Sequence, residues 1–407
     1  MNSLLIYIYS FFAAILVWLS YKAFRSGIEY ARFIREHLAV PVSKEQPFAT
    51  IFAPCRGVDP GFAKNLEQLF SQDHHEYEII FVVDDENDEA VGPINEAIAK
   101  FVNERVSAKL LVAPKANGSS QKIANLLHAI PHADERSSVF AFVDSDARTG
   151  SAWLASLTKA ALGPNVGAAT GYRWLISARP RLGSALASVW NASVASALGR
   201  NTMTNFCWGG SMAISRENFE RLDIKTHWQG ALSDDFAVTR AVHKAGLAIE
   251  FVPIAMCASI EDRSILDMLE FTTRQMKITR VYSPTLWIMS MIGSAIFCAV
   301  LIASILIAVA SEPFSLRFDI AVGVFVAVAG LTVGKALMRL NAVRLTLPQH
   351  DLILRKQDLS QTVLAFLTPA VFLVNSIAAL VSRRINWRGT VYELKSPSET
   401  VIIREKR

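Results

Sequence analysis

The stretch that decides the fold is residues 77–88, YEIIFVVDDEND, together with residues 139–146, VFAFVDSD. In both, a short apolar run ends directly in a cluster of acids. Strands this short and almost continuously apolar are typical of a mainly parallel sheet with helices on both faces. Ligands of such sheets bind outside the carboxyl ends of the strands. We therefore expect both acidic clusters to lie at one edge of a sheet, in a ligand site.

The same alternation continues on either side of these two stretches. Strand-like apolar runs at 48–53, 78–83, 109–113 and 139–143 alternate with helix-like spacing at 60–70, 90–102 and 121–130. Alternating β and α segments indicate an α/β domain. We predict a Rossmann-like nucleotide-binding domain with a mainly parallel sheet over residues 44–262.

Four runs without charge lie outside that domain, at 4–19, 284–310, 320–333 and 363–381. Charge-free runs of about 20 residues are typical of membrane spans. The basic residues near the first run follow it rather than precede it, which favours an uncleaved anchor over a signal peptide. We predict an N-terminal anchor at 1–23, a membrane region with two or three spans at 284–382, and a basic tail at 383–407.

Composition narrows the class of protein further. Hydrophobic residues make up 52% of the chain, and the net charge of +5 comes largely from basic residues beside the apolar runs, where they contact lipid head groups rather than nucleic acid. The four cysteines have no zinc-ligand spacing and fit a reducing compartment. We expect a multi-pass protein of the plasma (inner) membrane with its domain in the cytosol, because the basic flank of an anchor stays inside.

The second acidic cluster has the chemistry of a divalent-metal site. Asp144 and Asp146 flank one serine directly after an apolar strand. Two carboxylates in this position can hold Mg²⁺ or Mn²⁺ and leave coordination sites open for the oxygens of a diphosphate. An acidic surface turn is the competing interpretation of Asp-x-Asp alone, and the position at a strand end favours the metal.

Two further positions near this edge suit a phosphorylated ligand. Asp84 or Asp85 closes the earlier strand and could receive a nucleobase or ribose, although residues 84–88 could also cap the following helix. Lys122 opens a predicted helix, where a cation opposes the helix dipole unless it meets an anion such as phosphate. A solvated lysine is the alternative.

A second half of the site is predicted after residue 200. Asp234 and Asp235 precede a helix-like segment, where one carboxylate could act as a general base and the other could cap the helix. Trp208, Gly209 and Gly210 form an aromatic and two glycines, which either let the backbone approach a ligand closely or make a tight turn. An amphipathic helix at 263–283, bearing Arg274, Gln275 and Lys277, is predicted to lie at the membrane surface.

Taken together, these motifs resemble the family 2 inverting glycosyltransferases, and within them the ceramide glucosyltransferases. The segments that carry the resemblance are Arg-Gly-Val-Asp-Pro at 56–60, Asn-Leu-Glu at 65–67, residues 77–88, Lys-Ile-x-Asn-Leu at 122–126, Asp144, the Asp-Asp pair at 234–235 and Asn-Trp-Arg-Gly at 386–389 with Tyr392 and Leu394. The resemblance implies a glycosyltransferase A-type domain that places Asp85, Asp144 and Gly209-Gly210 at the donor and makes Asp235 the base.

The resemblance also implies a reaction: inverting transfer of a hexose or N-acetylhexosamine from a UDP-sugar to the hydroxyl of a membrane lipid, ceramide-like or other. One motif departs from the family. Where the family has Arg-Trp, this chain has Lys277-Ile278. Lysine keeps the charge but loses the planar fork, and isoleucine cannot stack on a sugar. This departure leaves sugar transfer in place and affects the choice of acceptor. The predicted contacts with the acceptor or with phosphate are Trp208, Arg274, Gln275 and Lys277.

Two other functions compete with lipid glycosylation. A processive polysaccharide synthase of the cellulose, chitin or hyaluronan type would need a translocation channel and the intact Arg-Trp motif. A non-catalytic membrane binder that kept the fold is supported only by the degenerate motif, and the retention of Asp85, Asp144, Asp146 and Asp235 argues against it.

Overall fold

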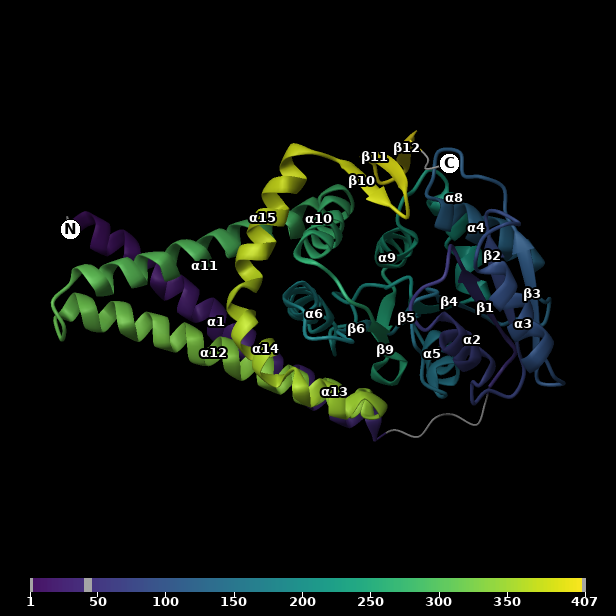
Figure 1. The fold of residues 1–407 in the computed structure, drawn as a ribbon, viewed down its shortest axis with the longest axis horizontal. Helices are drawn as coiled ribbons and strands as arrows, with labels where there is room; N and C mark the ends of the chain where they lie inside the picture. The colour runs from purple at the N-terminus through teal and green to yellow at the C-terminus, as the bar shows by residue number, and fades with distance from the viewer. Residues whose placement is uncertain (1–2, 40–45, 405–407) are drawn as a thin grey trace. The chain divides into compact units, whose positions relative to one another are not determined.

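The computed structural model describes residues 3–39 and 46–404 of the chain, so the predicted limits at residues 1, 44 and 407 fall outside the described residues. The chain divides into two compact units (Figure 1). The helical unit comprises Met1–Phe33, Arg179–Ser196 and Asp262–Ser382. The α/β unit comprises Ile34–Ala178, Ala197–Glu261 and Arg383–Arg407.

The α/β unit is built on a seven-stranded sheet in the order β3-β2-β1-β4-β7-β5-β8. All of its strands run parallel except β7, which is antiparallel to both β4 and β5. The strands are β1 (Ala49–Pro54), β2 (Tyr77–Val83), β3 (Val106–Val112), β4 (Val139–Val143), β5 (Val166–Thr170), β7 (Ser211–Ser215) and β8 (Ala248–Phe251). The predicted α/β fold class with a mainly parallel sheet is confirmed.

Helices cover both faces of this sheet, as the apolar strands require. Their bounds are α2 (Phe62–Phe70), α3 (Val91–Phe101), α4 (Gln121–Ala129), α5 (Trp153–Ala161), α7 (Arg216–Arg221), α8 (Ile224–Trp228) and α9 (Asp234–Lys244), with 3-10 turns η1 (Ile130–His132) and η2 (Pro253–Ala255). Ile80 and Phe142 belong to a buried cluster with residues of α4, α8 and α9. On the other face, Phe81 contacts Phe70 of α2, which in turn contacts Phe101 of α3. Each buried aromatic of this kind stabilises the fold by roughly 1.5–3 kcal/mol.

Two small sheets complete the α/β unit. Strands β6 (Arg173–Ile176) and β9 (Cys257–Ile260) form a parallel pair. Residues predicted as a basic tail form an antiparallel sheet of β10 (Arg384–Trp387), β11 (Thr390–Ser396) and β12 (Glu399–Arg404). This C-terminal sheet is fastened at the start of α4, where the backbone N–H of Gln121 donates to the Tyr392 hydroxyl at 3.3 Å.

Among the described residues, three helices are long and apolar enough to cross a membrane. They are α1 (Ser3–Leu38), α11 (Pro284–Ala310) and α12 (Leu316–Thr346). A fourth candidate is the pair Asp358–Phe366 and Thr368–Val381, bent by 56°. This agrees with one N-terminal and two or three C-terminal spans. The remaining elements are α6 (Leu182–Ala195), α10 (Ile265–Tyr282), η3 (Pro348–His350), α13 (Asp351–Lys356), α14 (Asp358–Val363), η4 (Leu364–Phe366) and α15 (Thr368–Val381).

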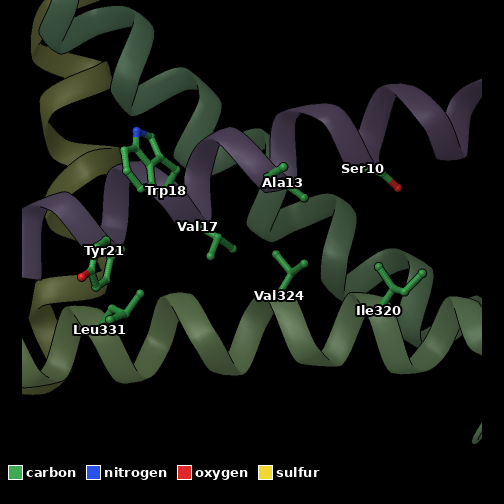
Figure 2. A pocket seen from close by; sticks show the side chains of 9 residues that line it. Ser10, Ala13, Val17, Trp18, Tyr21, Ile320, Val324 and Leu331 are labelled. Carbon is green, nitrogen blue, oxygen red and sulfur yellow. The ribbon is translucent and has the colours of Figure 1, made fainter.

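A groove of about 620 Å³ runs between α1 and α12 (Figure 2). Its lining is almost wholly apolar, and Val17 of α1 points toward Val324 of α12. Trp18 and Tyr21 line the same groove on the α1 side. None of the side chains that line the groove is charged, so this surface is suited to apolar chains.

Candidate active site

The two halves of the predicted site meet because of how β4 and β7 pair. These strands are antiparallel, and Val143 lies opposite Ser211. The residues that follow β4 and those that precede β7 therefore come together at one edge of the sheet. Asp144 and Asp146 belong to the first group, and Gly209 and Gly210 to the second. The pairing of β4 with β7 thus brings together residues that are more than 60 positions apart in the sequence.

Lys122 lies at the centre of this edge, in the first turn of α4. Its Nζ atom is 2.7 Å from Asp144 Oδ1 and 3.1 Å from Asp234 Oδ2. The side chain is only 12% exposed, so Lys122 is not a solvated lysine. Burial would lower the pKa of Lys122, but Asp144 and Asp234 outweigh it and raise that pKa above its ordinary value. The Lys122 ammonium is therefore held in its charged form between Asp144 and Asp234.

Asp144 and Asp146 differ in their surroundings. Burial would raise the pKa of the Asp144 carboxyl, but the Lys122 ammonium outweighs it and holds that pKa below its ordinary value. Burial raises the pKa of Asp146 to about 6, against the opposing effect of Arg173, whose Nη1 is 3.7 Å from Asp146 Oδ2. One carboxylate is thus neutralised by lysine, and the other is only loosely paired.

The donor set of this pair fits a metal that is shared with a ligand rather than held in a closed cage. Carboxylate oxygens are hard donors, and Mg²⁺ is usually bound through one or two of them together with phosphate oxygens and water. No group of three or more His, Cys, Asp or Glu side chains that could hold a metal occurs within residues 3–39 and 46–404. Metal binding by Asp144 and Asp146 stays a prediction.

The paired glycines leave the room that the charged side chains occupy. A Cβ atom on Gly209 would collide with Asp234 Oδ2 and come within 2.7 Å of Lys122 Nζ. On Gly210 it would collide with the Trp208 ring and come within 2.7 Å of Asp144 Oδ2. Trp208 is buried, and the Arg173 guanidinium lies 5.4 Å from its ring centroid. Close approach of side chains, rather than a plain turn, explains the two glycines.

Asp234 and Asp235 open α9 but have different environments. Ser233 is the N-cap residue, so neither aspartate takes that position. Asp234 is buried, which raises its pKa to about 6 against the opposing effect of Lys122. Asp235 is half-buried and accepts hydrogen bonds from the backbone N–H of Gly209 at 3.2 Å and of Phe236 at 2.7 Å, and from the Ser233 hydroxyl. Asp235 is therefore oriented and more accessible than its neighbour.

The end of β2 has a different character. Asp84 is buried and pairs with Lys115 Nζ at 2.8 Å and with Arg56 Nη1 at 4.0 Å. Asp85 is exposed, and the backbone N–H of Asn87 donates to it at 2.9 Å and lowers its pKa. Asp88 closes the turn before α3 by accepting from the backbone N–H of Ala90. Ala90 is the N-cap residue of α3 and no side chain caps this helix, so helix capping does not account for the acids of residues 84–88. Asp85 is the more exposed aspartate of the two that follow the strand.

The remaining predicted residues, Arg274, Gln275 and Lys277, lie on α10 in the helical unit. This helix begins with a capping box between Ser264 and Asp267. Lys277 is half-buried, and burial lowers its pKa. The side chain of Ile278, which stands at the family's tryptophan position, is buried. The contact of these residues with an acceptor or a phosphate stays a prediction.

Sequence reasoning assigned no role to Asp59 and Arg388, which the structure brings to the Asp144 side of the site. Arg388 Nη2 donates to both carboxylate oxygens of Asp59, at 2.9 and 2.7 Å. The Ser145 hydroxyl, between Asp144 and Asp146, donates to Asp59 Oδ2 at 2.9 Å. Both residues belong to motifs that carry the family resemblance, and this membership was the only indication in the sequence that they have a role.

Comparison with known proteins agrees with this geometry. The sequence matches glycosyl transferase family 21 over residues 10–400. The chain belongs to that family. The prediction of a glycosyltransferase and the resemblance to ceramide glucosyltransferases are confirmed.

Curated relatives of this family member match over a limited stretch. Ceramide glucosyltransferase 1 of Caenorhabditis elegans is 30% identical over 95 residues, which is 23% of this chain and 20% of that protein. The ceramide glucosyltransferase of Komagataella phaffii is 30% identical over 108 residues, 26% of this chain and 21% of that protein. The chain thus matches about a fifth of the length of these relatives.

A solved structure with a similar fold is a mannosyltransferase from Pyrobaculum calidifontis in complex with GDP-mannose and Mn²⁺. It is 17% identical, with a TM-score of 0.47, and the match covers 91% of this chain and 98% of that one. A likeness at this level does not bear on function.

Proposed function

We propose that this family 21 member is an inverting glycosyltransferase that moves a hexose or N-acetylhexosamine from a UDP-sugar to a hydroxyl group of a membrane lipid, ceramide-like or other. The observation that carries the proposal is the largely buried Lys122, which lies between Asp144 and Asp234 at the sheet edge, where two glycines leave room for these side chains. A fixed, largely buried cation beside acids at the carboxyl ends of strands suits a diphosphate leaving group.

In this proposal each carboxylate has one role. Asp235 takes the proton from the acceptor hydroxyl as its oxygen bonds to C1 of the sugar. The bond between C1 and the diphosphate oxygen breaks in the same displacement, and the electron pair stays on the diphosphate. Asp235 is held for this task by three donors, from Gly209, Phe236 and Ser233. Asp85, exposed at the end of β2, contacts the uridine.

A divalent ion is expected to take part in donor binding. Asp144 and Asp146 would hold Mg²⁺ or Mn²⁺, which supplies positive charge to the diphosphate oxygens when bound. Lys122 neutralises Asp144 when donor is absent, so two anions do not repel each other across the site. The catalytic domain is placed in the cytosol and the protein in the plasma (inner) membrane, because nucleotide-sugars are cytosolic and the basic flank follows the anchor.

A lipid acceptor is favoured over polysaccharide synthesis. Three helices, or four with the bent pair, are candidate spans within the described residues. A processive synthase needs a channel through its own helices and the intact Arg-Trp motif, whereas this chain has Lys277-Ile278 on α10. The processive alternative is therefore not favoured. Because Lys277-Ile278 replaces the Arg-Trp of the family, the lipid that accepts the sugar has to be identified by experiment.

The main test compares two carboxylates in the purified, full-length protein. We expect Asp235→Asn to bind UDP-sugar with unchanged affinity while transfer to extracted lipid falls by a factor of about 10² to 10⁴, the usual contribution of a general base. Radiolabelled sugar in the lipid fraction gives the rate, and calorimetry gives the affinity. Transfer that survives in this variant would move the role of base to Asp234 or another group.

The metal assignment has its own test. We expect Asp144→Ala to lose the part of donor affinity that depends on Mg²⁺ or Mn²⁺, so that chelation weakens binding in the wild type but not in the variant. Titration of UDP-sugar with and without metal measures this difference. An unchanged metal dependence in the variant would refute the role given to Asp144.

The alternative function is tested by the product of the wild-type reaction. Long water-insoluble sugar chains would favour the processive synthase.

A further inference from the structure

The tip of the hairpin between β10 and β11 places an arginine at the candidate active site. Trp387 pairs with Thr390, so Arg388 and Gly389 form a two-residue turn. Their φ angles are +52° and +83°. Two positive φ angles are the geometry of a type I′ turn, in which Asn or Asp with Gly are the usual residues. Arginine is unusual at the first position of such a turn. Backbone preference therefore does not explain why Arg388 is there, and its side chain must be considered.

The hairpin is held to the donor edge at several points. Arg56 Nη1 donates to the Thr390 hydroxyl at 3.4 Å, and the backbone N–H of Gln121 donates to the Tyr392 hydroxyl. Gln121 is the first residue of α4, directly before Lys122. The backbone carbonyl of Ser398, at the start of β12, lies so near Gly230 that a Cβ atom on Gly230 would collide with it. These contacts fix the turn, and with it Arg388.

The guanidinium of Arg388 is close to the metal-site carboxylates and only partly used. Nη2 alone contacts Asp59, and Asp59 also accepts from Ser145. Burial would lower the pKa of Arg388, but Asp59, Asp146 and Asp144 outweigh it and raise that pKa. The side chain is 42% exposed, and its Nη1 and Nε atoms make no hydrogen bond within residues 46–404. It has N–H groups to offer to a ligand.

We propose that Arg388 is a further catalytic residue, which binds the diphosphate of the donor and stabilises it as the leaving group. This inference rests on the proposed function and adds a residue to it. In the displacement, the electron pair of the broken bond between C1 and oxygen stays on the diphosphate, where Arg388 donates hydrogen bonds to it. Arginine presents a rigid, planar fork that matches two phosphate oxygens at once. Asp59 holds this fork at the site until the donor arrives.

A purely mechanical role makes a different prediction. If the pair of Arg388 and Asp59 only fastened the C-terminal sheet, losing either partner would have the same effect. If Arg388 acts on the diphosphate, its loss weakens diphosphate binding, whereas loss of the Asp59 charge frees the guanidinium for the ligand. The two substitutions should therefore change UDP affinity in opposite directions or by very different amounts.

The experiment measures the affinity of the full-length protein for UDP and for uridine in Arg388→Gln, Arg388→Lys and Asp59→Asn. We expect Arg388→Gln to weaken UDP binding by about 10- to 100-fold, the effect of losing hydrogen bonds to a charged group, with uridine affinity unchanged. Arg388→Lys should lie between it and the wild type. Asp59→Asn should bind UDP as well as or better than the wild type. Arg384→Gln is the matched control, since Arg384 is an exposed residue of the same sheet paired with Glu393.

The outcomes separate this inference from the proposed function. Unchanged UDP affinity in Arg388→Gln, or an equal loss of UDP and uridine affinity, overturns the role of Arg388, as does a loss in Asp59→Asn as large as that in Arg388→Gln. Sugar transfer by the wild type leaves the proposed function standing in each of those cases. A wild-type protein that binds no nucleotide overturns the proposed function itself. Arg388→Lys, which keeps the charge, decides the matter if Arg388→Gln does not fold.

Discussion

The two acidic strand ends look alike in sequence but differ in the cations that face them. After β2, Asp84 pairs with Lys115, whose side chain is 52% exposed. After β4, Asp144 and Asp146 face Lys122 and Arg173, whose side chains are each 12% exposed. Solvent screens the first pair and much less the second. We infer that the β4 end is arranged for diphosphate charge and the β2 end for the polar, uncharged part of a nucleotide.

Removal of the central lysine should show this difference most strongly. We expect Lys122→Met to lower the free energy of unfolding by about 3–5 kcal/mol, because it leaves the buried Asp234 and the half-buried Asp144 without their cation. Lys115→Met should change it by no more than about 1 kcal/mol, since an exposed pair contributes little. Thermal unfolding in detergent, calibrated with denaturant, gives both values. Equal losses in the two variants would remove the distinction between the strand ends.

Crowding at the β4 end gives a second, smaller effect. Gly210→Ala forces a Cβ atom against the Trp208 ring and within 2.7 Å of Asp144 Oδ2. We expect it to cost about 1–3 kcal/mol of stability, as overpacking does, and to reduce transfer by displacing Asp144. Gly199→Ala is the control, because nothing lies within 4 Å of a Cβ atom there. An active Gly210→Ala enzyme with wild-type stability would show that this edge is looser than its contacts indicate.

The smallest expected effect separates the two aspartates of the β2 end. Asp85→Asn should raise the donor KM by about tenfold with little change in kcat, because it removes one charge-assisted hydrogen bond to the nucleoside. Asp84→Asn should act mainly on stability, since that side chain is buried and paired. Steady-state kinetics and thermal unfolding of both variants test this division. A larger rise in KM for Asp84→Asn would transfer the nucleoside contact to Asp84.

Much of this architecture could be predicted because its signals are local. Apolar runs that end in acids indicate parallel strands and their ligand edge, and the seven-stranded sheet has both clusters at strand ends. Membrane helices are likewise visible as charge-free runs. The predicted anchor at 1–23 forms part of a longer helix, Ser3–Leu38, because no glycine or proline that would end it follows before residue 38 except Gly27, which packs against Lys335.

Contacts between distant residues could not be predicted in the same way. Lys122 is enclosed by two acids, Asp144 and Asp234, and Asp234 comes from α9, 112 positions later in the chain. The pair of Arg388 and Asp59 joins residues 329 positions apart. No local pattern encodes either contact. The motifs that contain these residues indicated that they matter, and only the fold indicates what they touch.

The C-terminal sheet has a consequence for how the protein is made. Residues 384–404 leave the ribosome after α11, α12 and α15, yet they belong to the same compact unit as the sheet formed by the earlier part of the chain. An even number of bilayer crossings between β9 and β10 would keep the two parts of this unit on one side of a membrane. Crossings by α11 and α12 alone would satisfy this, with the bent pair at 358–381 as a re-entrant segment. Arg388 can contact Asp59 only after residues 265–381 have been synthesised, so this ion pair forms late in the production of the chain.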